Sequence, residues 1–205
     1  MIAIVDYKAG NLTSVKLAFE YLGIPAEVTN RPEAILRADR VVFPGVGSAG
    51  AAMATIGALG LAEPLRAVIG QGTPFLGICL GTQIIFDQSE EDGGVRGLGF
   101  MAGTAKRFAP GSRADKVPQI GWNAVAFAAP HPLADGIATG SEFYFVHSYY
   151  PAPADRTCVL GETDYAGICF ASIVGRANLV ATQFHPEKSG RVGLRMLANF
   201  AAWKG

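Results

Sequence analysis

The feature that most constrains this chain is a cysteine set between two glycines, in Pro74-Phe75-Leu76-Gly77-Ile78-Cys79-Leu80-Gly81-Thr82-Gln83. The apolar run before the cysteine predicts a buried strand, and residues 82–86 predict a helix. A strand, a tight turn and a helix, with glycine two residues before and after the central residue, form the pattern of a nucleophile elbow. The glycines are needed because the turn leaves no room for a Cβ there. We expect Cys79 to project from the carboxyl end of a strand, where the helix start favours its reactive thiolate.

The same residues also fit a buried, inert cysteine beside a glycine turn. The motif Phe184-His185-Pro186-Glu187 favours the reactive interpretation, because a thiol nucleophile needs a base and the base needs an orienting partner. Residues two apart in an extended chain project to the same side, so His185 and Glu187 can form that pair. Of the other two histidines, His131 lies between prolines in a predicted surface turn and His147 follows an aromatic strand.

The loop Pro44-Gly45-Val46-Gly47 is the candidate for stabilising a negative charge during the reaction. Attack on a carbonyl or carboxamide creates an oxyanion, and each backbone amide aimed at it is typically worth ~3–4 kcal/mol. This loop and the amide of Leu80 are the natural donors. A plain strand-to-helix turn is the alternative interpretation of the loop.

Alternating strands and helices in the first half predict an α/β fold. Strands are expected at 2–5, 26–29, 40–43 and 75–78, with helices at 12–22, from Pro32, at 51–60 and at 63–70. Asn11 is expected to cap the first of these helices. This order predicts a mostly parallel sheet covered on both faces, with sites outside the carboxyl ends of its strands. The loop at 44–47 and Cys79 both lie at such ends.

The second half has the pattern of antiparallel strands. The expected strands span 117–127, 142–149, 158–162, 168–174 and 178–184, and a closing helix carries Val192, Met196, Phe200 and Trp203 on one face. A chain of 205 residues with this pattern and no linker is expected to form one domain, residues 1–205.

Composition excludes several classes of function. The 17 basic and 17 acidic residues balance, without a basic run that would bind nucleic acid or an anionic membrane. The segment Met1–Asp6 is typical of a first strand and not of a signal peptide. No apolar stretch approaches the ~20 residues that span a bilayer. Cys79, Cys158 and Cys169 have spacings unlike a zinc site or a disulfide framework. We expect a soluble, cytoplasmic protein without a metal or cofactor.

The elbow, the glycine loop and Phe184–Glu187 together resemble the class I (triad) glutamine amidotransferases. Five stretches are similar to the glutaminase subunits of imidazole glycerol phosphate synthases: Asp6-Tyr7-Lys8-Ala9-Gly10-Asn11-Leu12, Pro44-Gly45-Val46-Gly47, Pro118-Gln119-Ile120-Gly121-Trp122-Asn123, Phe145-Val146-His147-Ser148-Tyr149 and His185-Pro186-Glu187-Lys188-Ser189. The similarity covers essentially the whole chain. It departs at Lys8-Ala9, where the family commonly has a glycine and another residue, which leaves the detail of that loop open.

The resemblance implies the three-layer fold of class I glutaminases and a Cys-His-Glu triad. Cys79 is expected to attack the carboxamide of L-glutamine, with His185 as general acid and base and Glu187 orienting it. Val46 or Gly47, together with Leu80, is expected to supply the oxyanion hole. The amino-acid end of glutamine is expected to bind Gln83 and the backbone near Ser148 and Tyr149.

The resemblance also implies a heterodimer with a (β/α)8-barrel cyclase, which receives the ammonia for histidine biosynthesis. Asn11, Trp122, Tyr144 and Lys188 match family positions near that interface, although Trp122 and Tyr144 fit the core of the protein equally well. The resemblance further implies that glutaminase activity is low until the partner binds its own ligand. A physical hypothesis is that the loop at 44–47 holds an amide away from the oxyanion hole until docking turns it, which glycines make easy.

Three alternatives remain at this stage. Another triad glutaminase, such as one serving anthranilate or pyridoxal phosphate synthesis, tends to carry a Pro-Gly-Gly loop and no segment like Gly121-Trp122-Asn123. A related α/β cysteine hydrolase acting alone on γ-glutamyl compounds would turn over without a partner. A catalytically silent binding subunit is disfavoured because Cys79, His185 and Glu187 are all present.

Overall fold

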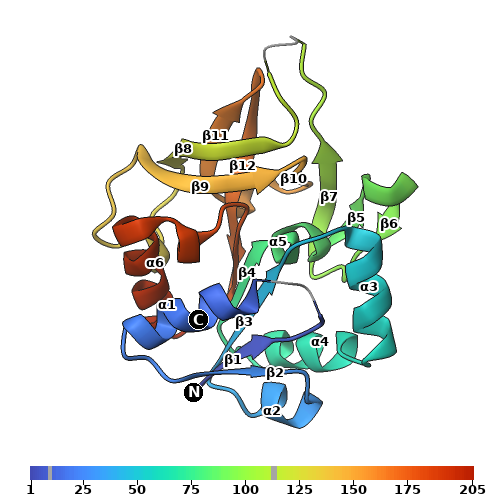
Figure 1. Ribbon diagram of the computed structural model, residues 1–205, viewed down its shortest axis with the longest axis vertical. Coiled ribbons are helices and arrows are strands. Elements are labelled where there is room, and N and C mark those ends of the chain that lie inside the picture. The colour runs from blue at the N-terminus through green and yellow to red at the C-terminus, as the bar shows by residue number, and fades with distance from the viewer. Residues whose placement is uncertain (9–10, 112–114) are drawn as a thin grey trace.

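A single large mixed sheet forms the centre of the molecule (Figure 1). The computed structural model describes residues 1–8, 11–111 and 115–205, so the turn predicted at Ala9 and Gly10 lies outside the described residues. In spatial order the strands are β2 (Ala26–Thr29), β1 (Ile2–Val5), β3 (Arg40–Gly45), β4 (Phe75–Cys79), β13 (Leu179–Thr182), β12 (Ile168–Arg176), β11 (Val159–Tyr165), β8 (Gln119–Phe127) and β9 (Ser141–His147). The pairings from β2 to β13 are parallel, and those from β13 to β9 are antiparallel.

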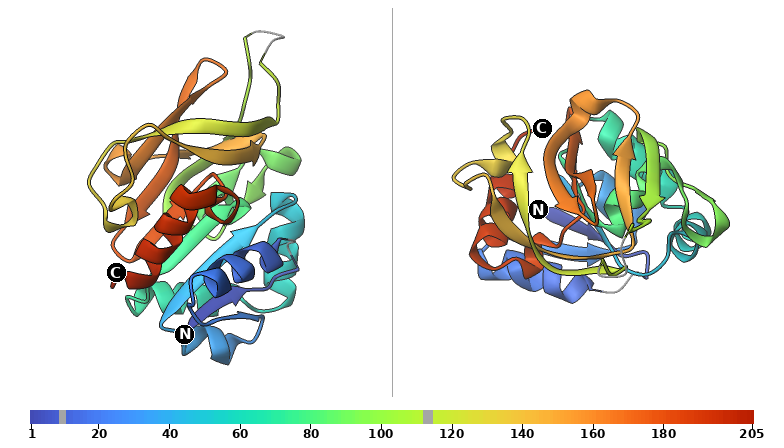
Figure 2. Two further views of the ribbon diagram at one scale, coloured as in Figure 1. Left: turned by 60° about the vertical axis from the view of Figure 1, so that its left-hand side comes forward. Right: turned by 90° about the horizontal axis from the view of Figure 1, so that it is seen from above.

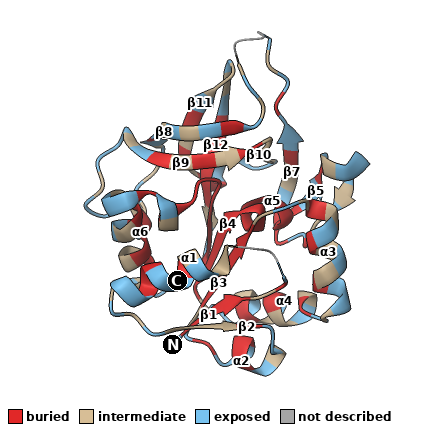
Figure 3. Cartoon of the chain, viewed as in Figure 1, coloured by how far each residue is buried: buried red, intermediate tan, exposed pale blue. Residues whose placement is uncertain are grey.

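Helices cover both faces of the parallel half, as the alternating apolar pattern of its strands requires. Ile2 and Ile4 of β1 share a core with α1 (Leu12–Tyr21) and α6 (Gly190–Ala202), which lie side by side in Figure 2. On the opposite face, Ala3 and Val5 share a core with α2 (Pro32–Leu36), α3 (Ala49–Ala58) and α4 (Ala62–Gly70). Figure 3 shows these central strands as buried. The predicted three-layer α/β architecture is confirmed.

A second, smaller sheet joins the edge of this core and was not expected. Its order is β10 (Tyr149–Pro153), β7 (Met101–Arg107), β5 (Phe86–Ser89) and β6 (Val95–Arg96). The strand predicted at 142–149 therefore divides at Ser148 between two sheets. Pro151 and Pro153 cannot donate to a ladder, which restricts β10 to an edge. The helix predicted at 82–86 is also wrong in its bounds.

That helix, α5, spans only Leu80–Ile84, because the fully buried Phe86 begins β5. Four 3₁₀ turns complete the described residues: η1 (Glu91–Gly93), η2 (Pro132–Ala134), η3 (Arg156–Cys158) and η4 (Pro186–Lys188). Within the described ranges no single helix has the length and hydropathy to cross a membrane, and only α3 and α4 taken together, bent by 89°, pass that test.

Candidate active site

Cys79 occupies a strained turn between β4 and α5. Its backbone angles, φ 55° and ψ −110°, lie outside the regions that L-residues normally adopt, at a cost of order 1–3 kcal/mol. A Cβ on Gly81 would lie 1.9 Å from the carbonyl oxygen of Phe43, and one on Gly77 would lie 2.9 Å from the Cβ of Ala181. Both glycines are therefore required by close packing, and the turn directs the Cys79 side chain away from the sheet.

The histidine and glutamate of the second motif form a buried pair beside this turn. Strand β13 runs parallel to β4 with Thr182 opposite Ile78, so the chain that continues from β13 reaches the level of Cys79. The Nδ1–H of His185 donates to Oε1 of Glu187 at 2.7 Å, and both side chains are shielded from solvent. The backbone of His185 is fixed as well: its N–H donates to Tyr144, and its carbonyl accepts from the Ser189 hydroxyl.

His185 faces Cys79 with its other nitrogen. Nε2 is buried and makes no hydrogen bond of normal geometry with any described residue. Burial by itself lowers the pKa of His185, but the charge of the nearby Cys79 sulfur, the polar contact of that sulfur with the ring and the bond to Glu187 raise it to about 10 overall. The sulfur is thus close enough to act on the ring although the pair does not have hydrogen-bond geometry. Such bonds often tighten only when substrate is bound, and the arrangement favours an imidazolium that can donate from Nε2.

A second buried histidine has the opposite electrostatic character. Burial lowers the pKa of His147 to about 4, the hydrogen bond to Tyr149 opposes that shift, and the charge of His185 adds to it. The Nδ1–H donates to the carbonyl of Tyr149 at 2.7 Å, and Nε2 lies 2.9 Å from Oε1 of Gln119. A neutral imidazole is satisfied there when Gln119 presents its NH₂ group. His147 therefore fixes the segment from 147 to 149 and does not serve as a base.

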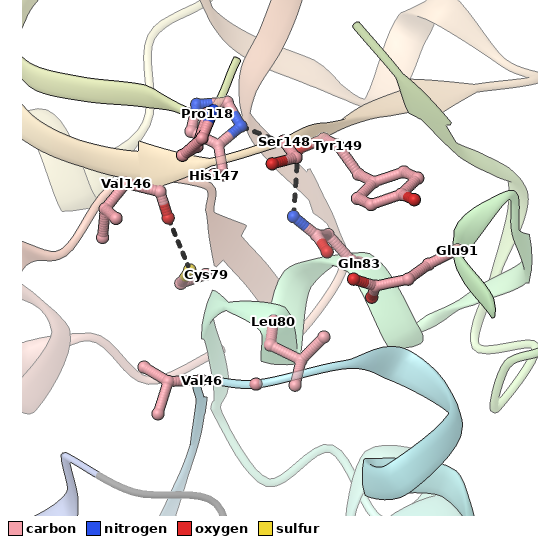
Figure 4. Close-up of a pocket in the computed structure, with 11 residues that line it drawn as sticks. Val46, Cys79, Leu80, Gln83, Glu91, Pro118, Val146, His147, Ser148 and Tyr149 are labelled. Carbon is pink, nitrogen blue, oxygen red and sulfur yellow. Dashed lines mark hydrogen bonds between the residues drawn. The ribbon is translucent and has the colours of Figure 1, made fainter.

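A cavity of about 250 Å³ opens in front of the cysteine (Figure 4). This volume suits a ligand smaller than drug-sized molecules. Its lining includes the predicted oxyanion and substrate residues, contributed by five separate segments: Val46, Gly47, Cys79, Leu80, Gln83, Glu91, Pro118, Val146, His147, Ser148 and Tyr149. His185 and Glu187 do not line it. The cavity thus brings the predicted oxyanion and substrate residues together around Cys79, with the His185–Glu187 pair beside the same turn.

Gln83 has its amide nitrogen already engaged by protein. Its NH₂ donates to the carbonyl of Tyr149 at 3.0 Å and to Oε1 of Gln183 at 3.1 Å. Its amide oxygen is therefore the group that remains for a ligand. Gln183, in turn, places its own amide nitrogen 3.8 Å from the sulfur of Cys79. Sequence analysis missed Gln183, although a glutamine at the end of a buried apolar strand was a usable signal.

Glu91 is a further residue of the cavity that sequence analysis missed. Burial raises its pKa, a hydrogen bond from the Ala49 amide opposes that rise, and Asp92 adds to it. The bond from Ala49 measures 2.7 Å and ties η1 to the start of α3, directly after the loop at 44–47. Among the described lining residues, Glu91 is the acidic one, so it is the group that can attract a ligand cation. The sequence shows it only as part of an ordinary acidic run.

Asn11 does not cap α1 as expected. It has a left-handed backbone, φ 72° and ψ 9°, and its side chain makes no capping hydrogen bond. Its Nδ2 instead donates to Oε1 of Glu187 at 2.6 Å, so the residue contacts the triad directly.

The other predicted interface residues lie at or near the surface. Trp122 and Tyr144 face each other across β8 and β9, with ring centroids 6.1 Å apart in an edge-to-face contact. Trp122 is 54% exposed, which rules out a core role for it, and Tyr144 is half-buried. Lys188 is exposed in η4. Their contact with a partner stays a prediction.

Comparison with known proteins gives the family. The model of the class-I glutamine amidotransferase family matches residues 3–203. The chain is 50% identical over 205 residues to the imidazole glycerol phosphate synthase subunit HisH of Desulfovibrio desulfuricans, covering 98% of this chain and 93% of that one. It is 47% identical over 200 residues to the HisH subunit of Dehalococcoides mccartyi, covering 98% and 96%.

Solved structures agree on the fold. The Thermotoga maritima PurLQS structure has a TM-score of 0.75 at 15% identity, covering 98% of this chain and 97% of the matched chain. The glutaminase domain of Trypanosoma brucei CTPS has a TM-score of 0.67 at 18% identity, covering 98% and 93%. These two show the architecture alone. The whole-length family match and the near-half identity to HisH subunits show that this chain belongs to the class-I glutamine amidotransferases, in the group of HisH subunits of imidazole glycerol phosphate synthase.

Proposed function

We propose that this chain is the glutaminase subunit of an imidazole glycerol phosphate synthase, with residues 1–205 acting as one domain that hydrolyses L-glutamine to glutamate and ammonia. The single observation that carries the proposal is the cysteine at a strained turn, with a cavity of about 250 Å³ in front of it and the buried His185–Glu187 pair beside it. The identity of the curated relatives along their whole length supports the same function.

Charge and hydrogen-bond complementarity orient the substrate in the cavity. The α-ammonium group of glutamine binds the carboxylate of Glu91 and the free amide oxygen of Gln83. The backbone at Ser148 and Tyr149 takes the α-carboxylate. Anchored at that end, the side chain extends toward Cys79 and brings the carboxamide carbon to the sulfur, which converts a bimolecular encounter into a positioned reaction.

The reaction proceeds through a thioester. The Cys79 thiolate attacks the carboxamide carbon, and the carbonyl oxygen becomes an oxyanion held by the amides of Leu80 and of Val46 or Gly47. As the carbon–nitrogen bond breaks, His185 gives its Nε2 proton to the leaving nitrogen and ammonia departs. His185 then removes a proton from water, the resulting hydroxide attacks the γ-glutamyl thioester, and the carbon–sulfur bond breaks to release glutamate. Glu187 stabilises the imidazolium that forms in each half.

The ammonia must pass directly to a partner protein, because free ammonia in neutral water is mostly protonated and no longer nucleophilic. A (β/α)8-barrel cyclase docked over the site receives the ammonia and joins it to a phosphorylated ribulosyl aminoimidazole carboxamide intermediate, in the cytoplasm. Trp122 is a suitable anchor for this contact, since exposed aromatic residues dominate many interfaces. Ile120, on the same strand, is 64% exposed and extends the apolar surface.

The test is glutamine consumption by the purified chain, measured alone and with a barrel cyclase subunit that carries its ligand. Formation of glutamate and ammonia that rises strongly with the ligand-bound partner is the expected result. Full turnover without a partner would instead identify a hydrolase that acts alone on γ-glutamyl compounds. Absence of turnover under both conditions would contradict the proposal.

A further inference from the structure

Tyr7 places a hydroxyl group inside the protein without a partner among the described residues. The residue follows β1, is 1% exposed, and packs its ring against Phe43 with centroids 5.0 Å apart. Its hydroxyl makes no hydrogen bond with any described residue. Unpaired buried hydroxyls are unfavourable and uncommon in native structures, so each one calls for an explanation.

The hydroxyl lies between the two segments that carry the proposed oxyanion donors. A Cβ built on Gly45 would lie 1.9 Å from the Tyr7 oxygen and 3.0 Å from the Cβ of Leu80. The Tyr7 oxygen thus occupies the space that any side chain at position 45 would need. Burial first, and the charge of Cys79 second, raise the pKa of Tyr7 above its usual value, so the phenol stays protonated and remains a donor.

A second cavity meets the loop at 44–47 on its Tyr7 side. It measures about 200 Å³ and is lined by Tyr7, Lys8, Val46, Gly47 and the start of α3. Val46 and Gly47 also line the cavity in front of Cys79, so they form a wall between the two spaces. A peptide in such a wall can rotate, and Gly47 already has φ 103°, which glycine adopts without strain.

Rotation of a peptide moves its two polar groups in opposite directions. When the amide of Val46 or Gly47 turns toward Cys79, the carbonyl of the same peptide turns toward the space beneath the loop, where the hydroxyl of Tyr7 lies. We propose that Tyr7 is a positioning residue of the oxyanion loop, whose hydroxyl donates a hydrogen bond to a main-chain carbonyl of Gly45 or Val46 and so stabilises the loop with its amide aimed at the reacting oxygen. The inference rests on the proposed glutaminase function.

The test compares Tyr7→Phe with the unaltered chain, both saturated with the ligand-bound cyclase subunit. Losing one neutral hydrogen bond in the active state lowers kcat for glutamine about five- to tenfold, with KM nearly unchanged. The midpoint of thermal unfolding stays constant or rises, because the variant loses a hydroxyl that has no partner in the part of the chain that the structure describes. Tyr21→Phe, which removes a hydroxyl from a 79% exposed ring, is the matched control and leaves kcat unchanged.

A second readout separates the loop from the nucleophile. Alkylation of Cys79 by iodoacetamide needs no oxyanion hole, so its rate and pH profile, followed on the Cys79 peptide by mass spectrometry, stay the same in Tyr7→Phe. A shifted alkylation profile would mean that the hydroxyl acts on the sulfur, and an unchanged kcat would mean that it has no role in turnover. A loss of kcat together with a lower unfolding midpoint would indicate a merely structural role. Each of these three results overturns the inference.

Failure of the proposed function is recognised separately, because the unaltered chain then consumes no glutamine although Cys79 still alkylates, and the inference falls with it.

Discussion

Oε1 of Glu187 accepts two hydrogen bonds, from Nδ1 of His185 at 2.7 Å and from Nδ2 of Asn11 at 2.6 Å. The orienting carboxylate is therefore itself oriented, by a residue at the opposite end of the sequence. Asparagine suits that place because it tolerates the left-handed backbone observed there. Asn11 also matches a predicted partner-interface position. Docking of the partner at that position can therefore affect Glu187 through the side chain of Asn11.

Replacing Asn11 with alanine removes a donor to a buried carboxylate. Hydrogen bonds to charged groups are worth ~1.5–3 kcal/mol, so Asn11→Ala should lower kcat for glutamine at least about tenfold, with KM little changed. Asn11→Asp should be worse, because a second carboxylate repels Glu187. Steady-state assays at saturating cyclase subunit separate this effect from weaker docking. Thr13→Ala, at an exposed position of the same helix, is the control. Wild-type kcat in Asn11→Ala would show that the hydrogen bond is dispensable.

Replacing Glu91 with glutamine tests the proposed site for the α-ammonium group. The amide oxygen of glutamine can still accept from Ala49, so α3 keeps its start, but the negative charge is lost. We expect KM for glutamine to rise about 10- to 100-fold and kcat to change little, since the lost contact is remote from the carboxamide. Asp92→Asn is the matched control because Asp92 bonds the neighbouring Gly50 amide without lining the cavity. An equal rise of KM in both variants would point to disturbance of α3.

The free energy of unfolding should depend on pH through His185. Its pKa is about 10 in the folded chain against ~6.5 when unfolded, so the folded state binds this proton more tightly. The stabilisation is fully present below about pH 6.5 and is lost as pH rises toward 10. Urea unfolding between pH 6 and 10 should show this slope in the unaltered chain and not in His185→Asn. His131→Asn should keep the slope, because burial lowers the pKa of His131. A slope that survives His185→Asn would assign the effect to other groups.

Substitution of Gly45 by alanine should conflict with the Tyr7 hydroxyl. The new Cβ would lie 1.9 Å from that oxygen, so Gly45→Ala is expected to cost ~1–3 kcal/mol of stability. In a Tyr7→Phe background the nearest ring atom is 3.2 Å away, so part of the loss should be recovered. Urea unfolding of the four proteins of the double-mutant cycle measures this coupling. Gly57→Ala, where a Cβ meets nothing within 4 Å, is the control. Additive effects would show that the two residues do not compete for the same space.

Local sequence pattern was sufficient to predict the parallel half of the sheet and the elbow. Alternating apolar residues and glycines at turns are signals that extend over only a few residues. Such local signals can be interpreted directly from the sequence. The bounds of α5 were wrong because Phe86 enters a second sheet, and its partner in that sheet is Met101. That pairing depends on tertiary contacts that periodicity does not report.

The residues of the site can also be divided into those that local sequence predicts and those that only tertiary contacts reveal. Cys79, His185 and Glu187 carry recognisable local motifs, so their type and spacing were informative. The contributions of Asn11, Glu91 and Gln183 arise from contacts between residues far apart in the chain. Asn11 even carries a misleading local signal, since an asparagine before a helix normally predicts a cap. Only the folded chain shows that its side chain is committed to Glu187.

The central claim is that Cys79 is the nucleophile. The direct measurement is mass spectrometry of the chain quenched with acid during turnover of glutamine with the ligand-bound cyclase subunit. We predict a γ-glutamyl adduct on the Cys79 peptide, its absence together with all ammonia release in Cys79→Ala, and folding of that variant to the same structure. Cys158→Ser and Cys169→Ser should retain both the adduct and activity. Ammonia release by Cys79→Ala, or an adduct on Cys158 or Cys169 instead, would contradict the account.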